Sequence, residues 1–319
     1  MSIEPRVRMR GISKTFRENG VTANKNVSFD AYSGEIHCIL GENGTGKSTL
    51  MHILSGLVQR DRGTIFIDGK EAIIRSPHEA RMLSIGMVHQ KPKMIPSLTV
   101  WENIILGDEP VRMGLFLSKR EAEARIIPLA ERYSIRVSLE QRVGELPLNL
   151  LQRAAILSLL YQGASILIFD EPTLPFTEEE SSQFYSVLHK LAAEGKTIIV
   201  VSHRIGEVLS FADRITVMRD GEAVYTAKAS DIDRKALASF MVGTDSEETS
   251  RASAATGEIL LELKGITASQ RHSLGINNIS FAVRRGEIVS VTGIRENGLE
   301  TLEDVIAGGI KPKSGQILY

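Results

Sequence analysis

The chain has a single cysteine, no excess of charge and no long uninterrupted apolar run. Cys38 alone excludes a disulfide within the chain, and its place in an apolar segment predicts a buried thiol. The formal net charge is −1, so the basic field by which proteins attract nucleic acid is missing, and no nucleic-acid partner is expected. The uncharged segment 154–169 is broken by Gln162 and Gly163, which predicts a helix followed by a strand rather than a membrane span.

The first residues also lack the apolar stretch of a secretory signal peptide, so none is expected. What is present is the composition of a soluble globular protein, with 42% hydrophobic and 24% charged residues. The length of 319 residues exceeds that of an ordinary domain and predicts about two domains.

A glycine-rich stretch after an apolar segment fits the phosphate-binding pattern Gly-x-x-x-x-Gly-Lys-Ser/Thr. Such glycines let consecutive backbone N–H groups surround an anion at the start of a helix, where the helix dipole also favours negative charge. Lys47 is expected to reach the β- and γ-phosphates of a nucleotide, and the Ser48 hydroxyl to ligate Mg2+. The predicted nucleotide-binding residues of this loop are Gly41, Glu42, Asn43, Gly44, Thr45, Gly46, Lys47, Ser48 and Thr49.

Apolar segments along the chain predict strands that alternate with helices, which favours a mainly parallel α/β sheet. The helix after the glycine-rich loop is expected to bury one face, formed by Leu50, Ile53, Leu54 and Leu57. Residues of about 97 to 160 carry no strong strand and are predicted to form an inserted helical subdomain. The predicted strands are Ile36–Leu40, Ile85–Gln90, Ile166–Phe169, Thr197–Val201 and Ile215–Met218.

A second nucleotide motif follows the apolar segment 166–169. Asp170 and Glu171 end this segment, which places one carboxylate where it can hold Mg2+ and the next where it can polarise an attacking water. Acidic turns are common, so the motif gains its weight from the phosphate loop before it. Asp170 lies 123 residues after Lys47, which leaves room for a helical insertion that compact GTPase-like domains lack.

The end of the chain repeats its beginning. Residues 27–66 align without a gap with residues 279–318, and this similarity predicts a duplicated domain. The polar stretch 244–257 has no periodicity and is the predicted linker. We therefore expect one domain in residues 1–243 and the first part of a second copy in residues 258–319, too short to complete its own sheet.

Taken in order, these motifs resemble the ATP-binding subunit of an ABC transporter across residues 7–241. The resemblance implies an α/β fold with a RecA-like phosphate-loop core, an antiparallel β subdomain and the inserted helices. It implies ATP and Mg2+ as cofactors and hydrolysis of ATP coupled to transport. By their positions, Phe16 is implied to stack on adenine, and Gln90 to contact Mg2+ and relay movement to a membrane subunit. Glu171 is implied to polarise the water and His203 to contact the γ-phosphate.

The segments 86–90 and 96–103 are similar to those of importers of simple sugars and nucleosides, whose ATPase is a fused double domain. Riboflavin importers share these motifs, so the cargo stays open. The resemblance implies integral-membrane permease subunits as partners, a solute-binding protein that acts through the permease, and a second ATPase domain paired head to tail. It also implies a peripheral position on the cytoplasmic face of the inner membrane.

Two stretches depart from the pattern of the family. The ABC signature reads close to Leu-Ser-Gly-Gly-Gln, but residues 146–149 read Leu-Pro-Leu-Asn and lack the serine and glycines that would approach the γ-phosphate. In the repeat, Leu299 and Glu300 stand where the loop has lysine and serine, and a carboxylate there should repel phosphate. In a head-to-tail pair both losses fall on one ATP site. We therefore expect a single hydrolytic site, whose signature comes from another sequence.

Two other functions remain open on the sequence. A soluble ABC-type ATPase that acts on ribosomes or DNA is disfavoured by the near-neutral charge. A non-catalytic ATP-binding regulatory protein is favoured by the altered signature and by the incomplete second copy. Turnover distinguishes the second alternative from a transport ATPase.

Overall fold

The computed structural model describes residues 4–112, 116–174, 176–243, 257–270, 273–293 and 297–319. The chain divides into two compact units, Met1–Ser246 (unit 1) and Glu247–Tyr319 (unit 2), which are described separately. The predicted linker, residues 244–257, lies outside the described residues except for its last position. None of the helices in the described ranges is long and apolar enough to cross a membrane.

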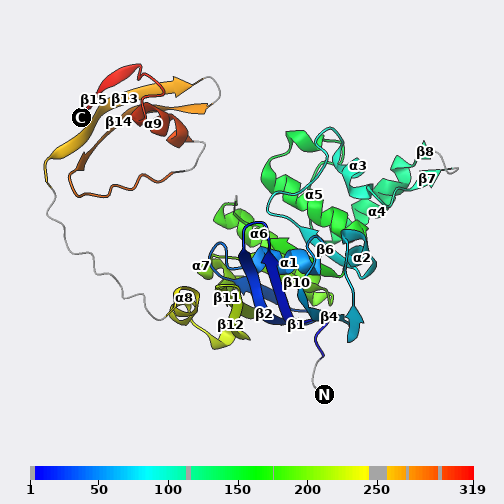
Figure 1. Ribbon diagram of the computed structural model, residues 1–319. Coiled ribbons are helices and arrows are strands. Elements are labelled where there is room, and N and C mark those ends of the chain that lie inside the picture. Colours follow the sequence, from blue (N-terminus) through cyan, green and yellow to red (C-terminus); the bar gives the residue numbers. More distant parts are fainter. Residues whose placement is uncertain (1–3, 113–115, 175, 244–256, 271–272, 294–296) are drawn as a thin grey trace. The chain divides into compact units, whose positions relative to one another are not determined.

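Unit 1 is built around a six-stranded sheet in the order β12-β11-β3-β10-β9-β6 (Figure 1). All neighbouring strands run parallel except β11 and β12. Parallel strands read as continuous apolar runs because both of their faces are covered. The strands of this sheet are β3 (Ile36–Leu40), β6 (Ile85–Val88), β9 (Ile166–Asp170), β10 (Thr197–Ser202), β11 (Arg214–Arg219) and β12 (Glu222–Lys228).

Side chains of β3 alternate between two hydrophobic cores, one on each face of the sheet. Ile36, Cys38 and Leu40 pack in one core with residues of α5 (Leu148–Tyr161), α6 and α7, and Cys38 is a buried free thiol as predicted. Ile39 packs in the other core with residues of α1 and of a second, antiparallel sheet. The helices beside the strands are α1 (Lys47–Leu54), α6 (Glu178–Ala193), α7 (Ile205–Phe211) and α8 (Arg234–Val242), with the 3-10 turn η2 (Ala229–Asp231) before α8.

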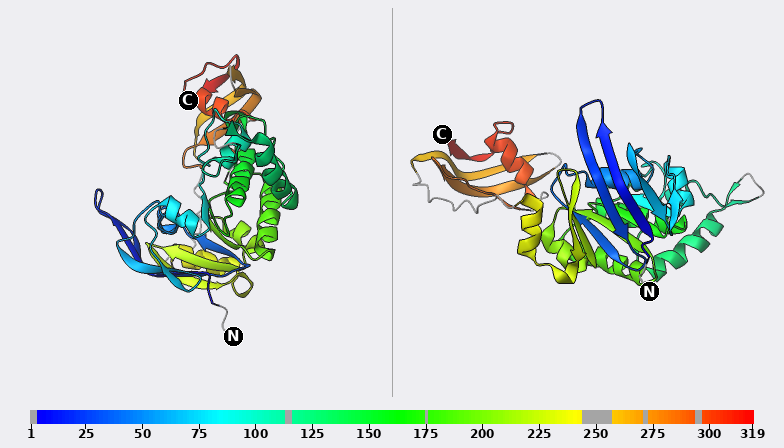
Figure 2. Two further views of the ribbon diagram at one scale, coloured as in Figure 1. Left: turned by 90° about the vertical axis from the view of Figure 1, so that its right-hand side faces the viewer. Right: turned by 60° about the horizontal axis from the view of Figure 1, so that its bottom comes forward.

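The antiparallel sheet has the order β2-β1-β4-β5. Its strands are β1 (Val7–Phe16), β2 (Val21–Ala31), β4 (Arg62–Ile67) and β5 (Lys70–Ala72). The hairpin of β1 and β2, in dark blue, projects beyond the rest of unit 1 in both views of Figure 2. Phe16 is the last residue of β1 and pairs with Val21, so it lies at the tip of this hairpin.

Between β6 and β9 the chain is mainly helical. Thr99 and Glu102 form a capping box that starts α3, and α5 ends before Gln162, so the uncharged run 154–169 splits into a helix and a strand as predicted. The elements around this region are α2 (Pro77–Met82), α3 (Val100–Ile105), β7 (Val111–Arg112), β8 (Phe116–Leu117), α4 (Lys119–Arg132), η1 (Val143–Glu145) and α5 (Leu148–Tyr161).

The described residues of unit 2 form a three-stranded sheet, β14-β13-β15, and one helix, α9. The same order occurs in unit 1, where β2, β1 and β4 take the places of β14, β13 and β15. Residues 252 positions apart also share a left-handed backbone: φ is 91° at Gly46 and 88° at Gly298, and 53° at Asn26 and 54° at Asn278. The elements are β13 (Ile259–Gln270), β14 (Ser273–Arg284), α9 (Leu299–Ile306) and β15 (Ser314–Leu318).

One segment of unit 2 differs from its counterpart in unit 1. Residues 287–293 form no strand, and Ile288 is 85% exposed, whereas Ile36 is fully buried in β3. In unit 1, β3 is paired on both sides, by β10 and β11. The described residues of unit 2 include no counterpart of these two strands, so this segment has no strand on either side to pair with.

Each predicted strand is present, although one of them is shorter than predicted, and one predicted helix is also shorter than expected. The strand expected over Ile85–Gln90 ends at Val88, so the polar pair after it lies in a loop. Leu57 was expected on the buried face of the helix after the phosphate loop, yet α1 ends at Leu54 and Leu57 is 41% exposed. Gly56, with φ of 76°, follows the end of the helix in a left-handed conformation that cannot continue it. The position requires glycine, because a Cβ atom there would lie 2.3 Å from the Ser76 carbonyl oxygen.

The buried His37 predicts a loss of stability at acid pH. Burial lowers the pKa of His37, and this outweighs the nearby Glu35, whose carboxylate lies 3.6 Å from Nδ1. The unfolded chain takes up a proton below about pH 6.5, whereas the folded chain does not until a lower pH. The free energy of unfolding should therefore fall as the pH drops below about 6.5, by at most about 1.4 kcal/mol per pH unit for this one proton.

Urea unfolding at pH 7.5 and 5.5 measures this loss. His37→Gln should show a smaller difference between the two pH values, because the neutral amide has no proton to gain. His78 is exposed, so His78→Gln is the matched control and should keep the wild-type difference. An equal pH dependence in wild type and His37→Gln would contradict the prediction.

Candidate nucleotide-binding site

The phosphate loop connects β3 to α1. Two of its positions require glycine because a larger residue would clash with neighbouring backbone. Gly46 has φ of 91°, and a Cβ atom there would lie 2.0 Å from the Ala23 carbonyl oxygen. A Cβ atom on Gly41 would lie 2.3 Å from the Met218 carbonyl oxygen. Gly46 precedes α1 and brings no side chain to cap it. The first N–H groups of α1 therefore point to a region where an anion can accept from them.

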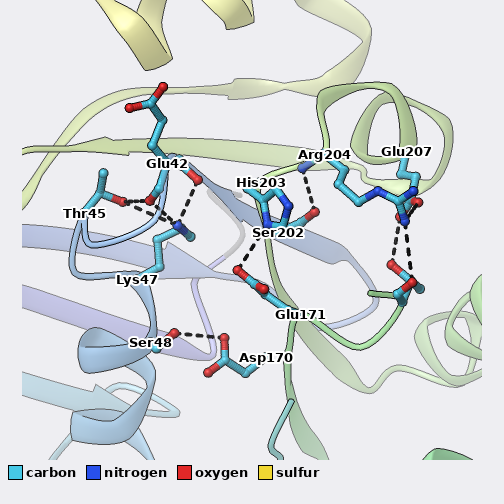
Figure 3. Close-up of polar contacts among 12 residues, drawn as sticks. Glu42, Thr45, Lys47, Ser48, Asp170, Glu171, Ser202, His203, Arg204 and Glu207 are labelled. Carbon is cyan, nitrogen blue, oxygen red and sulfur yellow. Dashed lines mark hydrogen bonds and ion pairs between the residues drawn. The ribbon is translucent and has the colours of Figure 1, made fainter. Parts of the chain in front are cut away.

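Lys47 is folded into the loop that carries it. Its ammonium group donates to the carbonyl oxygens of Gly41 and Glu42, at 2.8 and 2.6 Å (Figure 3). Only 4% of Lys47 is exposed. Burial lowers the pKa of Lys47, and the carboxylates of Glu171 and Asp170 act in the opposite direction. A phosphate group bound at this loop would supply the negative charge that the buried ammonium needs.

Ser48 and Asp170 meet below the loop, although 122 residues separate them. The Ser48 hydroxyl donates to Asp170 Oδ1 at 3.0 Å, and Asp170 is 8% exposed. Burial raises the pKa of Asp170, while the hydrogen bond from Ser48 lowers it. A hydroxyl and a carboxylate oxygen at this distance are the hard ligands that Mg2+ prefers beside nucleotide phosphates. The residues present therefore fit the predicted metal.

Glu171 and His203 approach each other beyond the ends of two neighbouring strands. Glu171 Oε1 lies 3.2 Å from His203 Nδ1, and Figure 3 shows the two side chains facing each other beside Lys47 and Asp170. Glu171 has φ of 47°, a left-handed backbone that is uncommon for glutamate, and its N–H donates to the Val201 carbonyl oxygen at 3.0 Å. This left-handed conformation makes the chain turn at Glu171, directly after β9 ends at Asp170.

Seven of the nine predicted loop residues, those from Asn43 to Thr49, line one pocket of about 280 Å³. Phe16 is part of its wall, and the Lys14 ammonium lies 5.5 Å from the centroid of the Phe16 ring. A flat aromatic ring at one end and a phosphate loop at the other suit a nucleoside phosphate. The residues that line this pocket are Phe16, Val21, Ala23, Asn43, Gly44, Thr45, Gly46, Lys47, Ser48, Thr49 and Glu171.

The structure does not place every predicted residue at the pocket. Gln90 follows β6 and has an exposed side chain, and among the described residues it is not part of the pocket wall. Its backbone carbonyl accepts a hydrogen bond from the Gln152 amide of α5 at 3.4 Å. Glu42 and Gly41 act on the pocket through their carbonyl oxygens, which hold Lys47.

The segment at the signature position begins α5. Pro147 is the residue before the helix, and Asn149 donates a hydrogen bond to Glu180 of α6. Pro147 has no N–H group to donate, and the Asn149 amide is engaged within unit 1. Leu174, in the stretch after Glu171, is 47% exposed, and the next residue, Pro175, lies outside the described residues.

Asn24 supports the phosphate loop, and the sequence analysis did not find it. Its side-chain amide donates to the Gly46 carbonyl oxygen at 3.0 Å, and its side chain is fully buried in β2. The same carbonyl also accepts from Leu50 N at 2.9 Å in the first turn of α1. A polar residue at an inward position of a strand, between Ala23 and Val27, was the signal that could have indicated it.

Asn24→Leu should weaken binding of MgATP about fivefold. The change removes one neutral hydrogen bond to the loop, worth about 1 kcal/mol. Titration of a fluorescent ATP analogue measures the dissociation constant. Asn103 is a buried asparagine elsewhere, which donates to the Ile95 and Thr99 carbonyls, so Asn103→Leu is the matched control: it should lower the melting temperature and keep the affinity. Equal affinities in wild type and Asn24→Leu would rule out this role.

Comparison with known proteins connects this geometry to a family. Residues 24–174 match the ABC transporter family. The nucleoside import ATP-binding protein NupA of Lactococcus lactis subsp. cremoris (strain MG1363) is 41% identical over 99% of this chain and 62% of its own length. The guanosine import ATP-binding protein NupO of Bacillus subtilis (strain 168) is 39% identical over 98% of this chain and 61% of its own. The chain thus spans about three fifths of the length of these relatives.

Solved structures share the fold of unit 1. The cbiO1 protein from Clostridium perfringens, part of the ABC transporter complex cbiONQ, superposes with a TM-score of 0.63 at 25% identity, over 74% of this chain and 93% of that protein. The ATP-binding cassette MJ0796, solved as a dimer bound to ADP and Pi in a post-hydrolysis state, gives a TM-score of 0.61 at 27% identity, over 70% of this chain and 98% of that one.

Proposed function

We propose, on the premise that unit 1 of this chain belongs to the ABC transporter family of ATP-binding proteins, that the chain binds MgATP and hydrolyses it to power the import of a small solute. One observation carries the proposal. Lys47, Ser48 and Glu171 line one phosphate-loop pocket, and Asp170 and His203 contact two of them: Asp170 accepts a hydrogen bond from Ser48, and His203 lies 3.2 Å from Glu171. The five residues come from three distant parts of the sequence. This is the set of groups that phosphoryl transfer to water requires.

The protein's contribution to the reaction is positioning and charge stabilisation. Lys47 and the N–H groups at the start of α1 hold the β- and γ-phosphates. Ser48 and Asp170 would hold Mg2+, which would neutralise charge on the phosphates when bound. Glu171 accepts a hydrogen bond from the attacking water and orients it toward the γ-phosphate, and His203, beside it, donates to a γ-phosphate oxygen. Phe16 stacks on the base.

Gln90 is proposed to join the metal site when the pocket is filled. In the structure its loop is held to α5 by the bond from Gln152, and α5 belongs to the helical region. A rearrangement of this loop on binding would connect the Mg2+ site with the surface of the helical region. The proposed receiver of that movement is a permease subunit in the membrane.

The cargo is proposed to be a nucleoside or a simple sugar. The relatives named above import nucleosides or guanosine, and the ribose import ATP-binding protein RbsA of Bacillus licheniformis (strain ATCC 14580) is 37% identical over 98% of this chain and 62% of its own length. Riboflavin remains a prediction from motifs alone. Selection of the cargo is assigned to the permease and to a solute-binding protein, with this chain at the cytoplasmic face of the membrane.

Unit 2 is proposed to be the first part of a second, degenerate ATPase domain. The shared strand order and the matching left-handed positions at an interval of 252 residues support this reading. A complete pair of such domains, head to tail, would combine the Leu-Pro-Leu-Asn segment with the loop that carries Leu299 and Glu300. Only the pocket of Lys47 would then hydrolyse ATP, with a signature from another sequence.

Measurement of MgATP binding and of phosphate release by the purified protein tests the proposed function. Saturable binding with turnover supports a transport ATPase. Saturable binding without turnover, alone and with its membrane partners, favours the alternative, a non-catalytic ATP-binding regulatory protein, which the altered signature segment also suggests. Absence of binding would refute both functions.

A further inference from the structure

The carboxylate of Glu207 is bonded to side chains from three separate segments. The hydroxyl groups of Thr173 and Tyr185 donate to Glu207 Oε2 at 2.8 and 2.7 Å. The Arg204 guanidinium forms an ion pair with Oε1 of the same carboxylate. Thr173 follows β9, Tyr185 belongs to α6, and Arg204 follows β10, so one carboxylate joins two loops and a helix.

The two hydroxyl donors of this cluster are shielded from water, whereas the side chains of Arg204 and Glu207 are 43% and 20% exposed. Thr173 is 4% exposed and Tyr185 is 7% exposed, and the Tyr185 ring stacks on Phe211 with centroids 3.9 Å apart. Burial raises the pKa of Tyr185, so the phenol stays protonated and acts as a donor to Glu207. Hydrogen bonds to a charged acceptor in such surroundings hold their geometry firmly.

The two loops that Glu207 joins are those of the proposed catalytic pair. Thr173 lies two residues after Glu171, and Arg204 follows His203 directly. The ladder between β9 and β10 ends with the pair Asp170 and Val201, so Glu171 and His203 lie beyond the regular sheet. His203 has a partly exposed side chain, 35%, and sheet pairing alone does not fix it.

We propose that Glu207 is a positioning residue for the pair Glu171 and His203. By holding Thr173 and Arg204, its carboxylate keeps the loop after β9 and the loop after β10 in register, so that Glu171 Oε1 and His203 Nδ1 remain within hydrogen-bonding distance. This inference rests on the proposed function for its effect on turnover. A purely structural alternative is that Glu207 only stabilises the first turn of α7, where Arg204 is the residue before the helix.

The test is a set of conservative changes. Glu207→Gln keeps the shape and removes the charge, and Tyr185→Phe and Thr173→Val each remove one donor. Each variant should lower kcat for ATP, roughly ten- to hundredfold for Glu207→Gln, because small displacements of reacting groups have effects of this size. The affinity for MgATP should stay unchanged, since none of these residues lines the phosphate-loop pocket.

A matched control lies in the same unit. Tyr133 is 3% exposed, donates to Glu194, and has Arg132 as the neighbour that pairs with that carboxylate, so it repeats the chemistry of the Glu207 cluster away from the pocket. Tyr133→Phe should keep the wild-type kcat. If it lowers kcat as much as Tyr185→Phe does, loss of general stability explains both effects and the proposal is wrong.

Coupling to His203 separates positioning from stability. In a His203→Ala background Glu207→Gln should cause a smaller further loss of kcat than in the wild type, because one of the two groups that Glu207 positions is already absent. Independent losses that multiply would overturn the proposal. Long-range 1H–15N spectra of the histidine rings provide a readout that needs no turnover, with the His203 signal assigned by His203→Ala.

In Glu207→Gln the His203 ring signals should change, whereas those of the exposed His78 should not. Unchanged His203 signals would refute the positioning role even if ATP is hydrolysed. Changed signals in a protein that binds MgATP without turnover would support positioning and refute only the hydrolytic function. The two hypotheses therefore fail on different observations.

Discussion

Glu171→Gln is expected to reduce the rate of ATP hydrolysis at least about a hundredfold and to preserve nucleotide binding. A side chain that orients and polarises the attacking water contributes about 10²- to 10⁴-fold to a rate. The amide has nearly the same shape, so it can keep the contact with His203 and the left-handed backbone at this position. The amide of glutamine cannot accept a proton from water at neutral pH, so the variant cannot activate the water that attacks the γ-phosphate.

Binding should survive because Glu171 holds no phosphate. Its negative charge lies near Lys47 and faces the pocket that receives the phosphates, so its removal should leave the MgATP affinity equal or higher. Phosphate release and titration of a fluorescent ATP analogue measure the two quantities separately. Glu131 is an exposed glutamate of α4, and Glu131→Gln should match the wild type in both. Turnover above a tenth of the wild-type rate in Glu171→Gln would falsify the role of Glu171.

Lys47→Ala is expected to weaken MgATP binding about ten- to hundredfold. The ammonium is buried, and its hydrogen bonds to charged phosphate oxygens are worth about 1.5–3 kcal/mol. In the structure the same group donates to two carbonyl oxygens of the loop, so a bound phosphate replaces these neutral acceptors with charged ones. The alanine variant loses the binding free energy that this exchange of acceptors provides.

The folded state should tolerate this change. Burial disfavours the charged form of Lys47, as the lowered pKa shows, so its removal relieves a desolvation cost while it leaves two carbonyl oxygens without a donor. Thermal melting without nucleotide should differ little from the wild type, and the shift caused by MgATP should shrink. Lys70 is exposed on β5, and Lys70→Ala is the control with unchanged affinity. An unaltered affinity in Lys47→Ala would remove the phosphate-binding role from this loop.

Several parts of the site could be read from local sequence. The phosphate loop is a continuous stretch whose glycines, lysine and serine act within a few residues of one another. The strands of the central sheet are apolar runs bounded by polar turns, and their limits agree with prediction to within about two residues. Both signals depend on the preferences of neighbouring residues, and local patterns record such preferences directly.

Other parts of the site depended on contacts between distant residues. Asn24 and Gly46 are 22 positions apart, and Glu207 is 34 positions from Thr173. Neither pair has a motif, because each contact arises only when segments that are distant in the sequence pack side by side. The end of α1 at Leu54 was also outside the reach of periodicity: the apolar pattern continues to Leu57, but Gly56, which lies against Ser76 in a left-handed conformation, cannot continue the helix.

The sequence by itself determined which chemical groups this protein can bring to a nucleotide and on which kinds of element they lie, because these follow from residue type and short-range spacing. Only the tertiary structure decided how those groups meet: the distance between Ser48 and Asp170, the pairing of Glu171 with His203, and the exclusion of Gln90 from the pocket wall. The physical reason is that such contacts are set by the register of parallel strands and by steric packing across the sheet. Both result from many weak interactions between residues that are distant in the sequence, and no single stretch of sequence contains all of these residues.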